Sequence, residues 1–190
     1  MTTTSELCEP APTKINFWEL LDLIKEKTVP LANLSPSRYR LNSDGAAKRN
    51  PGPAAAGIVI YDPFEVQLGG WAWYLGPLTN NAAEYSALLL GLTKAFGLGI
   101  KKLLVQMDSE LVARQMLGQY RVRHPGILPY YEKAKELAAG FEEIVFSHVY
   151  RERNGHADRL ASEAADYGQR GLLGINGELD KKDTPLFLRG

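Results

Sequence analysis

The chain has 190 residues, with 22 basic and 22 acidic side chains and a formal net charge of zero. This length suits one domain with extensions, and a hydrophobic fraction of 45% excludes a disordered chain. Zero net charge argues against bulk electrostatic binding of nucleic acid but allows a local basic groove. The one cysteine, Cys8, excludes an internal disulfide and favours a reducing compartment. Without a targeting signal or an apolar run of roughly 20 residues, we expect a cytoplasmic protein with no membrane partner.

The sequence divides into three zones: an extension over 1–37, a main domain over 38–168 and a tail over 169–190. Apolar residues in the extension recur at the spacing of one helical face. They are Phe17, Leu20, Leu21 and Ile24. Asn16 and Glu19 have the spacing of a capping box at the start of this helix. The pattern favours a helix that packs on the main domain, and a helix that binds a partner is the alternative.

The main domain begins with strands and continues with alternating helices and strands. Strands are predicted over 39–43, 56–61 and 66–74 and are joined by short turns. The remaining predicted elements are helix 81–98, strand 103–107, helices 110–117 and 127–139, strand 144–149 and helix 156–167. This order predicts an α/β fold: a mixed five-stranded sheet, an antiparallel meander plus parallel strands, with helices on both faces.

Four carboxylates stand at positions that core packing does not explain. Asp44 and Asp108 end two predicted strands. Glu84 and Asp158 lie in the first turns of two predicted helices. Strand ends and helix starts collect at one edge of an α/β sheet, so we expect these acids to meet there. Each alone has a structural alternative, either a turn-forming Asp or an acid that interacts with a helix dipole.

The chemistry of four neighbouring carboxylates favours metal binding. Carboxylates held together repel one another, which raises at least one pKa unless a cation is present. Oxygen ligands without His or Cys favour Mg²⁺ or Mn²⁺ over zinc. Two such ions, about 3.5–4 Å apart, commonly support in-line displacement at a phosphodiester. The acids therefore predict a site for two Mg²⁺ ions, with Mn²⁺ as a possible substitute.

The segments around these acids are similar to those of type 1 ribonuclease H, in its short-loop archaeal and bacterial form. The four segments are YRLNSDGA (39–46), TNNAAEYSAL (79–88), MDSELV (107–112) and NGHADRLA (154–161). Together they are far more specific than any one of them. The resemblance implies an RNase H-like fold that cleaves the RNA strand of RNA–DNA hybrids. It also implies that the catalytic and metal-binding acids are Asp44, Glu84, Asp108 and Asp158.

The same resemblance implies a set of contacts with the hybrid. Asn50 matches a residue that reads the RNA minor groove, and Asn80 and Asn81 match hybrid-contacting residues. Thr79 matches a residue that binds a DNA phosphate, and Gly45 belongs to the same substrate-binding set. Amides and hydroxyls suit the wide minor groove and its 2′-hydroxyls. For Thr79 and Asn80, capping of the following helix is the alternative, and the two roles are compatible.

Two features depart from the family pattern. The loop that carries a His in many members is too short here, which leaves Arg151 and Arg153 as candidates to replace that His. The basic protrusion of some members is also missing, although Arg121 and Arg123 remain available to meet the DNA backbone. Fewer displaced counterions would give a lower affinity and a shallower salt dependence than in members with the protrusion.

Two other functions stay open. A nucleic-acid-binding module of the same fold without catalysis would be favoured by loss of one of the four acids, and all four are present. A DNA-directed nuclease of this fold would begin with Asp-x-Glu on its first strand, whereas this chain has Asp44-Gly45-Ala46. We expect the chain to act as a monomer on an RNA–DNA hybrid.

Overall fold

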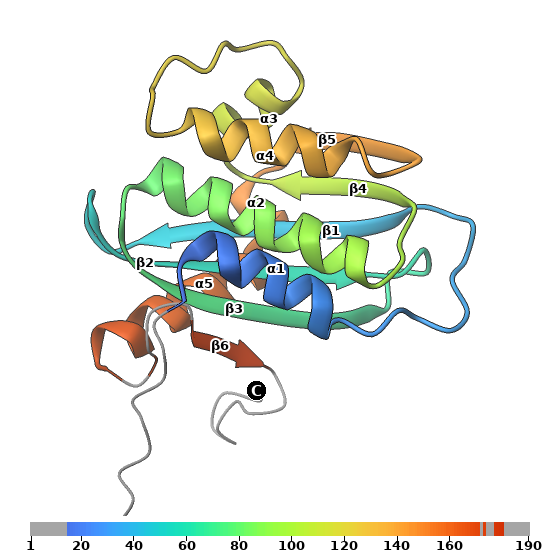
Figure 1. Cartoon of the computed structure of the whole chain (residues 1–190), viewed down its shortest axis with the longest axis horizontal. Coiled ribbons are helices and arrows are strands. Elements are labelled where there is room, and N and C mark those ends of the chain that lie inside the picture. Colours follow the sequence, from blue (N-terminus) through green and yellow to red (C-terminus); the bar gives the residue numbers. More distant parts are fainter. Residues whose placement is uncertain (1–14, 172, 174–176, 181–190) are drawn as a thin grey trace, which may run out of the picture.

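The computed structural model describes residues 15–171, 173 and 177–180 (Figure 1). Within this part of the chain, six strands form one mixed sheet in the order β5-β4-β1-β2-β3-β6. Their bounds are β1 (Tyr39–Ala47), β2 (Gly52–Tyr61), β3 (Gln67–Leu78), β4 (Lys102–Met107), β5 (Glu143–His148) and β6 (Gly177–Asp180). The pairs β1–β2 and β2–β3 are antiparallel, whereas β1–β4 and β4–β5 are parallel. The predicted combination of a meander with parallel strands is confirmed.

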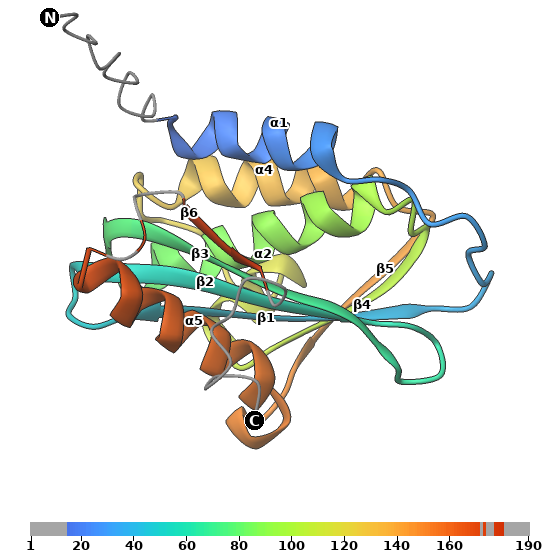
Figure 2. The same ribbon diagram turned by 90° about the horizontal axis from the view of Figure 1, so that it is seen from below.

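Helices cover both faces of the sheet, as predicted. Their bounds are α1 (Phe17–Lys27), α2 (Asn80–Gly97), α3 (Glu110–Met116), α4 (Leu128–Ala138) and α5 (Gly155–Gln169). Figure 2 shows α2 against one face with α1 and α4 outside it, and α5 against the opposite face. The contacts agree, because α2 packs on β1, β2, α1 and α4, while α5 packs on β1, β2 and β3. The sheet is therefore enclosed by a thick helical layer and a thin one.

The apolar stripe of the N-terminal extension forms α1 and docks on the main domain. Leu20, Leu21 and Ile24 are buried and belong to the main core. Asn16 Oδ1 accepts hydrogen bonds from two backbone N–H groups of the first turn, and the Glu19 carboxylate accepts the Asn16 N–H. This capping box satisfies N–H groups that have no partner within the helix. Helix α1 therefore forms an outer layer over α2.

Strands β1 and β2 extend further toward their connecting turn than the sequence predicted. We expected the first strand to end at Ser43, but pairing continues to Ala47, so Asp44 lies inside β1 rather than at its end. Small residues with weak strand propensity remain paired here because helix α5 packs closely over them. In the unpredicted part of β2, Ala55 is fully buried in a cluster with Ala164 and Ala165 of α5. Tertiary packing therefore overrides the local preference for a turn.

Strand β6 was not predicted, because we assigned its residues to the tail. Gly177–Asp180 pairs antiparallel with β3 and completes the edge of the sheet. The three-zone division stays a prediction, since residues 1–14 and 181–190 lie outside the part of the chain that the structure describes. Among the described helices, none combines the length and the apolar character needed to span a membrane.

Candidate active site

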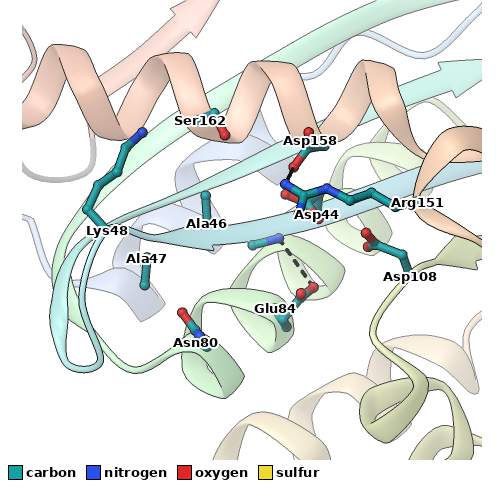
Figure 3. Close-up of a pocket in the computed structure, with 11 residues that line it drawn as sticks. Asp44, Ala46, Ala47, Lys48, Asn80, Glu84, Asp108, Arg151, Asp158 and Ser162 are labelled. Atoms are coloured by element: carbon teal, nitrogen blue, oxygen red, sulfur yellow. Dashed lines mark hydrogen bonds and ion pairs between the residues drawn. The ribbon is translucent and has the colours of Figure 1, made fainter.

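The four predicted acids line one cavity of about 320 Å³ beside β1, at the start of α5 (Figure 3). Its lining residues are Asp44, Gly45, Ala46, Ala47, Lys48, Asn80, Glu84, Asp108, Arg151, Asp158 and Ser162. The acids come from β1, α2, α5 and the residue that follows β4. Carboxylates from segments that are far apart in the sequence therefore line the same cavity. Their catalytic roles stay predictions.

Three of the acids are close enough to share a cation. Carboxylate oxygens of Asp44, Glu84 and Asp108 all lie within 4.8 Å of one another. Burial, followed by the nearby charges of Asp108 and Asp158, raises the pKa of Asp44 to about 8. Burial and the Asp44 charge also raise the pKa of Glu84 well above its ordinary value. Such repulsion among oxygen donors is what a divalent cation would relieve, so these residues fit Mg²⁺ or Mn²⁺.

Gly45 fixes Glu84 beside Asp44. The Gly45 N–H donates to Glu84 Oε2 over 3.2 Å. A Cβ at position 45 would lie 2.2 Å from the backbone of Ala83 and of Glu84. Only glycine therefore allows β1 and α2 to approach this closely, and that approach brings their two acids together.

A buried amide pair fixes Asp108. Asn154 Nδ2 donates to Asp108 Oδ1 and to the carbonyl oxygen of Ser43, each over 2.9 Å. Asn42 Nδ2 donates to Asn154 Oδ1 over 3.1 Å, and Arg40 donates to Asn42 Oδ1. Both asparagines are buried. We did not predict this role for either one; the available signal was an Asn at position 42 inside a predicted strand.

Arg151 pairs with the fourth acid. It begins the short 3₁₀ turn η1 (Arg151–Arg153), and its guanidinium forms an ion pair with the Asp158 carboxylate. This single turn connects β5 closely to α5, which agrees with the short loop inferred from the sequence. Of the two candidates to replace the loop His, Arg151 lines the cavity and Arg153 does not.

Of the predicted substrate-binding residues, Gly45 and Asn80 line the cavity, and the others belong to the neighbouring β1–β2 turn and the start of α2. Asn50 Oδ1 accepts the Asn80 N–H over 3.1 Å, which joins the β1–β2 turn to the start of α2. Thr79 Oγ1 accepts the Ala82 N–H, so the capping alternative is confirmed for Thr79. Asn80 lines the cavity, and the exposed Asn81 lies beside it in the sequence but is not part of the lining. Contact with a hybrid stays a prediction for all of them.

Two further polar residues that we did not predict, Lys48 and Ser162, also line the cavity. Lys48 Nζ lies 3.0 Å from Asp166 Oδ1 on α5. Ser162 lies on the same helix, four residues after Asp158. Figure 3 shows Lys48 at the end of the cavity away from Asp108 and Arg151. The cavity therefore has an acidic end and a basic, hydroxyl-bearing end.

A mixed sheet with an acidic cavity beside its first strand defines a ribonuclease H-like domain, and comparison with known proteins agrees. A family model described as Reverse transcriptase-like matches residues 42–164. The bifunctional protein Rv2228c of Mycobacterium tuberculosis is 42% identical over 127 residues, which are 66% of this chain and 35% of that protein. The solved N-terminal RNase H domain of Rv2228c has a TM-score of 0.69 and 39% identity, over 71% of this chain and 98% of that one.

Two further solved structures are similar over nearly their whole length. RNase H1 of Halobacterium salinarum has a TM-score of 0.67 and 36% identity, over 68% of this chain and 98% of that one. LC11-RNase H1 was isolated from compost and solved in complex with an RNA/DNA hybrid. It has a TM-score of 0.66 and 38% identity, over 69% of this chain and 99% of that one. The chain therefore belongs to the Reverse transcriptase-like family and, within it, to the type 1 ribonuclease H group. It spans 35% of the length of Rv2228c.

Proposed function

We propose that this chain is an endoribonuclease that hydrolyses the RNA strand of RNA–DNA hybrids with the help of two divalent cations. The observation that carries the proposal is the convergence of the four acids on one cavity, with oxygens of three of them within 4.8 Å of one another. Hybrid as the substrate is supported by LC11-RNase H1, a relative at 38% identity that was solved with an RNA/DNA hybrid.

The residues that would hold the cations are Asp44, Glu84, Asp108 and Asp158. Mg²⁺ fits the all-oxygen donor set, and Mn²⁺ would substitute because it accepts the same ligands. Bound ions of this kind supply an activated water and a positive charge that stabilises the leaving oxygen. The raised pKa of Asp44, about 8, supports a cation here, because ionisation of this carboxyl is opposed by burial and by its acidic neighbours.

The chain's own residues set the positions of these acids. The Gly45 N–H holds the Glu84 carboxylate toward β1. Asn154 donates a hydrogen bond to one carboxylate oxygen of Asp108 and so orients this acid. Arg151 holds Asp158 and is largely exposed, so it can exchange that carboxylate for a phosphate. We infer that Arg151 performs the product-release step attributed to the loop His in many family members.

The hybrid would lie along the rim formed by the β1–β2 turn and the start of α2. The residues assigned to it are Asn50, Thr79, Asn80, Asn81 and Gly45. Asn50 and Asn80 are joined by a hydrogen bond at this rim, and Asn80 reaches the cavity. Their amide groups can donate to and accept from 2′-hydroxyls and base edges in a wide minor groove. RNA is thereby distinguished from DNA beside the acids that would act on it.

The test is to incubate the purified chain with end-labelled RNA–DNA hybrid, duplex RNA, duplex DNA and each single strand. We expect Mg²⁺-dependent cuts inside the RNA strand of the hybrid, none with a chelator, and none with Asp44→Asn. Glu136→Gln is the matched control, since that acid lies on α4 in an exposed ion pair. Binding of hybrid without cutting would indicate the non-catalytic module, and cutting of duplex DNA would indicate the DNA-directed nuclease.

We also propose that the active unit is a monomer. The four acids that carry the proposal converge within one copy of the chain, so the proposed metal site needs no residue from a second copy. Light scattering coupled to size-exclusion chromatography should give the mass of one chain in the fraction that cuts hybrid. A dimer mass in that fraction would overturn this part of the proposal. The cytoplasmic location stays a prediction from the sequence.

A further inference from the structure

The acidic end of the cavity poses an electrostatic problem for the substrate. A nucleic-acid strand carries a negative charge at every phosphate, and the four acids repel it. Cations held by the acids would attract the phosphate that is cut, but they leave the neighbouring phosphates without a partner. The other end of the same cavity has the opposite character, because Lys48 and Ser162 line it (Figure 3).

The backbone of Lys48 is fixed, whereas its side chain is loosely held. Lys48 directly follows β1, and its N–H donates to the carbonyl oxygen of Pro53 over 2.9 Å. From this anchored position the side chain reaches across to α5, where Nζ lies 3.0 Å from Asp166 Oδ1. The two side chains are 34% and 50% exposed. An exposed pair of this kind contributes about 0–1 kcal/mol, so an entering phosphate can displace Asp166.

Helix α5 links the two ends of the cavity. Asp158, Ser162 and Asp166 are spaced four residues apart, so they lie along one face of the helix. Four residues advance a helix by about 6 Å, which is comparable with one nucleotide step along a strand. Ser162 therefore lies about one nucleotide step along α5 from Asp158, on the side toward Lys48.

From this arrangement we propose a second phosphate subsite, in which Lys48 Nζ and Ser162 Oγ bind the RNA backbone phosphate next to the one that is cut. Lys48 leaves Asp166 and pairs with the phosphate as the strand enters. The ligand belongs to the RNA strand rather than the DNA strand, because the subsite lines the same cavity as the acids. The subsite rests on the proposed function and extends it to a neighbouring phosphate.

The test compares Lys48→Ala with Lys133→Ala, a closely matched surface lysine. Lys133 Nζ lies 2.8 Å from Glu136 Oε1, and its side chain is 35% exposed. We would measure kcat and KM for hybrid cleavage at several KCl concentrations. Lys48→Ala should raise KM about three- to tenfold and make log KM less steep against log salt by about 0.7–0.9, as expected for one lost phosphate contact. Its kcat should change less than about twofold, and Lys133→Ala should behave as the wild type.

Two further comparisons identify the strand and guard against a folding defect. A methylphosphonate in place of the neighbouring RNA phosphate should abolish the difference in KM between Lys48→Ala and wild type, whereas the same change in the DNA strand should preserve it. If thermal unfolding shows that Lys48→Ala is unstable, Lys48→Gln replaces it in the same measurements. Lys48→Arg keeps the positive charge and should keep the wild-type salt dependence. Asp166→Asn should lower KM or leave it unchanged, because it releases Lys48.

The outcomes separate this inference from the proposed function. A wild type that cuts hybrid, with Lys48→Ala and Lys133→Ala equal in KM and salt dependence, overturns the subsite and leaves the nuclease standing. A KM difference that disappears only with the DNA-strand methylphosphonate overturns the assignment to RNA. A wild type that neither binds nor cuts hybrid overturns both proposals.

Discussion

The two ends of the cavity are built in different ways. At the acidic end, Asp44 is only 5% exposed, and partly buried hydrogen bonds hold the neighbouring acids Glu84 and Asp108. At the basic end, the Lys48 side chain is 34% exposed and one surface ion pair holds it. The acids must keep fixed positions to hold cations, whereas a lysine on a flexible stem can follow a phosphate. Changes at the acidic end should therefore have the larger effects.

The largest effect should come from Asp44→Asn. A neutral amide is a far weaker ligand for hard cations than a carboxylate, so hybrid cleavage should fall by about 10³-fold or more. The measurement is single-turnover cleavage at saturating Mg²⁺, with Glu136→Gln as the control. Cleavage by the purified variant at close to the wild-type rate would remove Asp44 from the catalytic set.

Asn154→Ala should have the next largest effect, because it frees Asp108 from its buried partner. Loss of a group that orients a metal ligand commonly costs about 10- to 100-fold in metal affinity. Isothermal titration with Mn²⁺ would measure this loss for Asn154→Ala and for Asn42→Leu, which keeps the Asn154–Asp108 bond and should lose less. Unchanged metal affinity with lower stability in Asn154→Ala would mean that the amide is purely structural.

The repulsion at the acidic end should also appear in metal-free stability. In the folded protein the pKa of Asp44 is about 8, against 3.8 for the free group. The folded state therefore keeps a proton that the unfolded state releases, so the free energy of unfolding should fall as pH rises from about 4 to 8. Asp44→Asn removes this pH-dependent loss of stability, so its free energy of unfolding relative to wild type should increase by on the order of 4 kcal/mol between pH 5 and pH 8.

Urea unfolding in EDTA at several pH values would measure this difference. Glu136→Gln again serves as the control, and its offset from wild type should not vary with pH in the same way. If the offset between Asp44→Asn and wild type is the same at every pH, the account of repulsion at Asp44 is wrong. If the variant is markedly less stable throughout, Asp44 is instead a structural hydrogen-bonding group.

The smallest effect among these predictions should come from Arg151→Ala. The side chain is exposed and its ion pair with Asp158 lies at the edge of the acidic end, so we expect a loss of about three- to tenfold in kcat. Because the proposed role is product release, the first turnover should be nearly unaffected. Rapid-quench measurement of the burst and the steady state would separate the two. An equal loss in both would place Arg151 in the cleavage step itself.

The convergence of the acids could be predicted from the sequence because it follows from a general property of α/β sheets. Strand ends and helix starts gather at one edge, and each acid was next to such a boundary. The position of Asp44 was wrong in detail, since β1 continues to Ala47 through residues of weak strand propensity. That extension depends on α5 packing over the sheet, which local sequence does not show.

The supporting contacts could not be predicted because they join distant segments. Asn42 and Asn154 are 112 positions apart, and no pattern in either segment indicates the other. The Lys48–Asp166 pair joins the β1–β2 turn to α5 in the same way. Strand β6, Gly177–Asp180, is short and follows no alternating pattern; it is recognised only by its pairing along β3. Sequence patterns therefore indicated which acids make up the site, whereas the contacts that position its residues became visible only in the fold.

The most direct test of the central claim is calorimetric titration of the wild type with Mg²⁺ at pH 7, repeated in buffers of different ionisation enthalpy. Because the pKa of Asp44 is about 8 without metal, its carboxyl should be largely protonated at this pH. Binding should release at least one proton per chain, since the pKa of Glu84 is raised as well, and both binding and release should be lost in Asp44→Asn. Binding that releases no proton, or that persists in the variant, would contradict a cation site built on these acids.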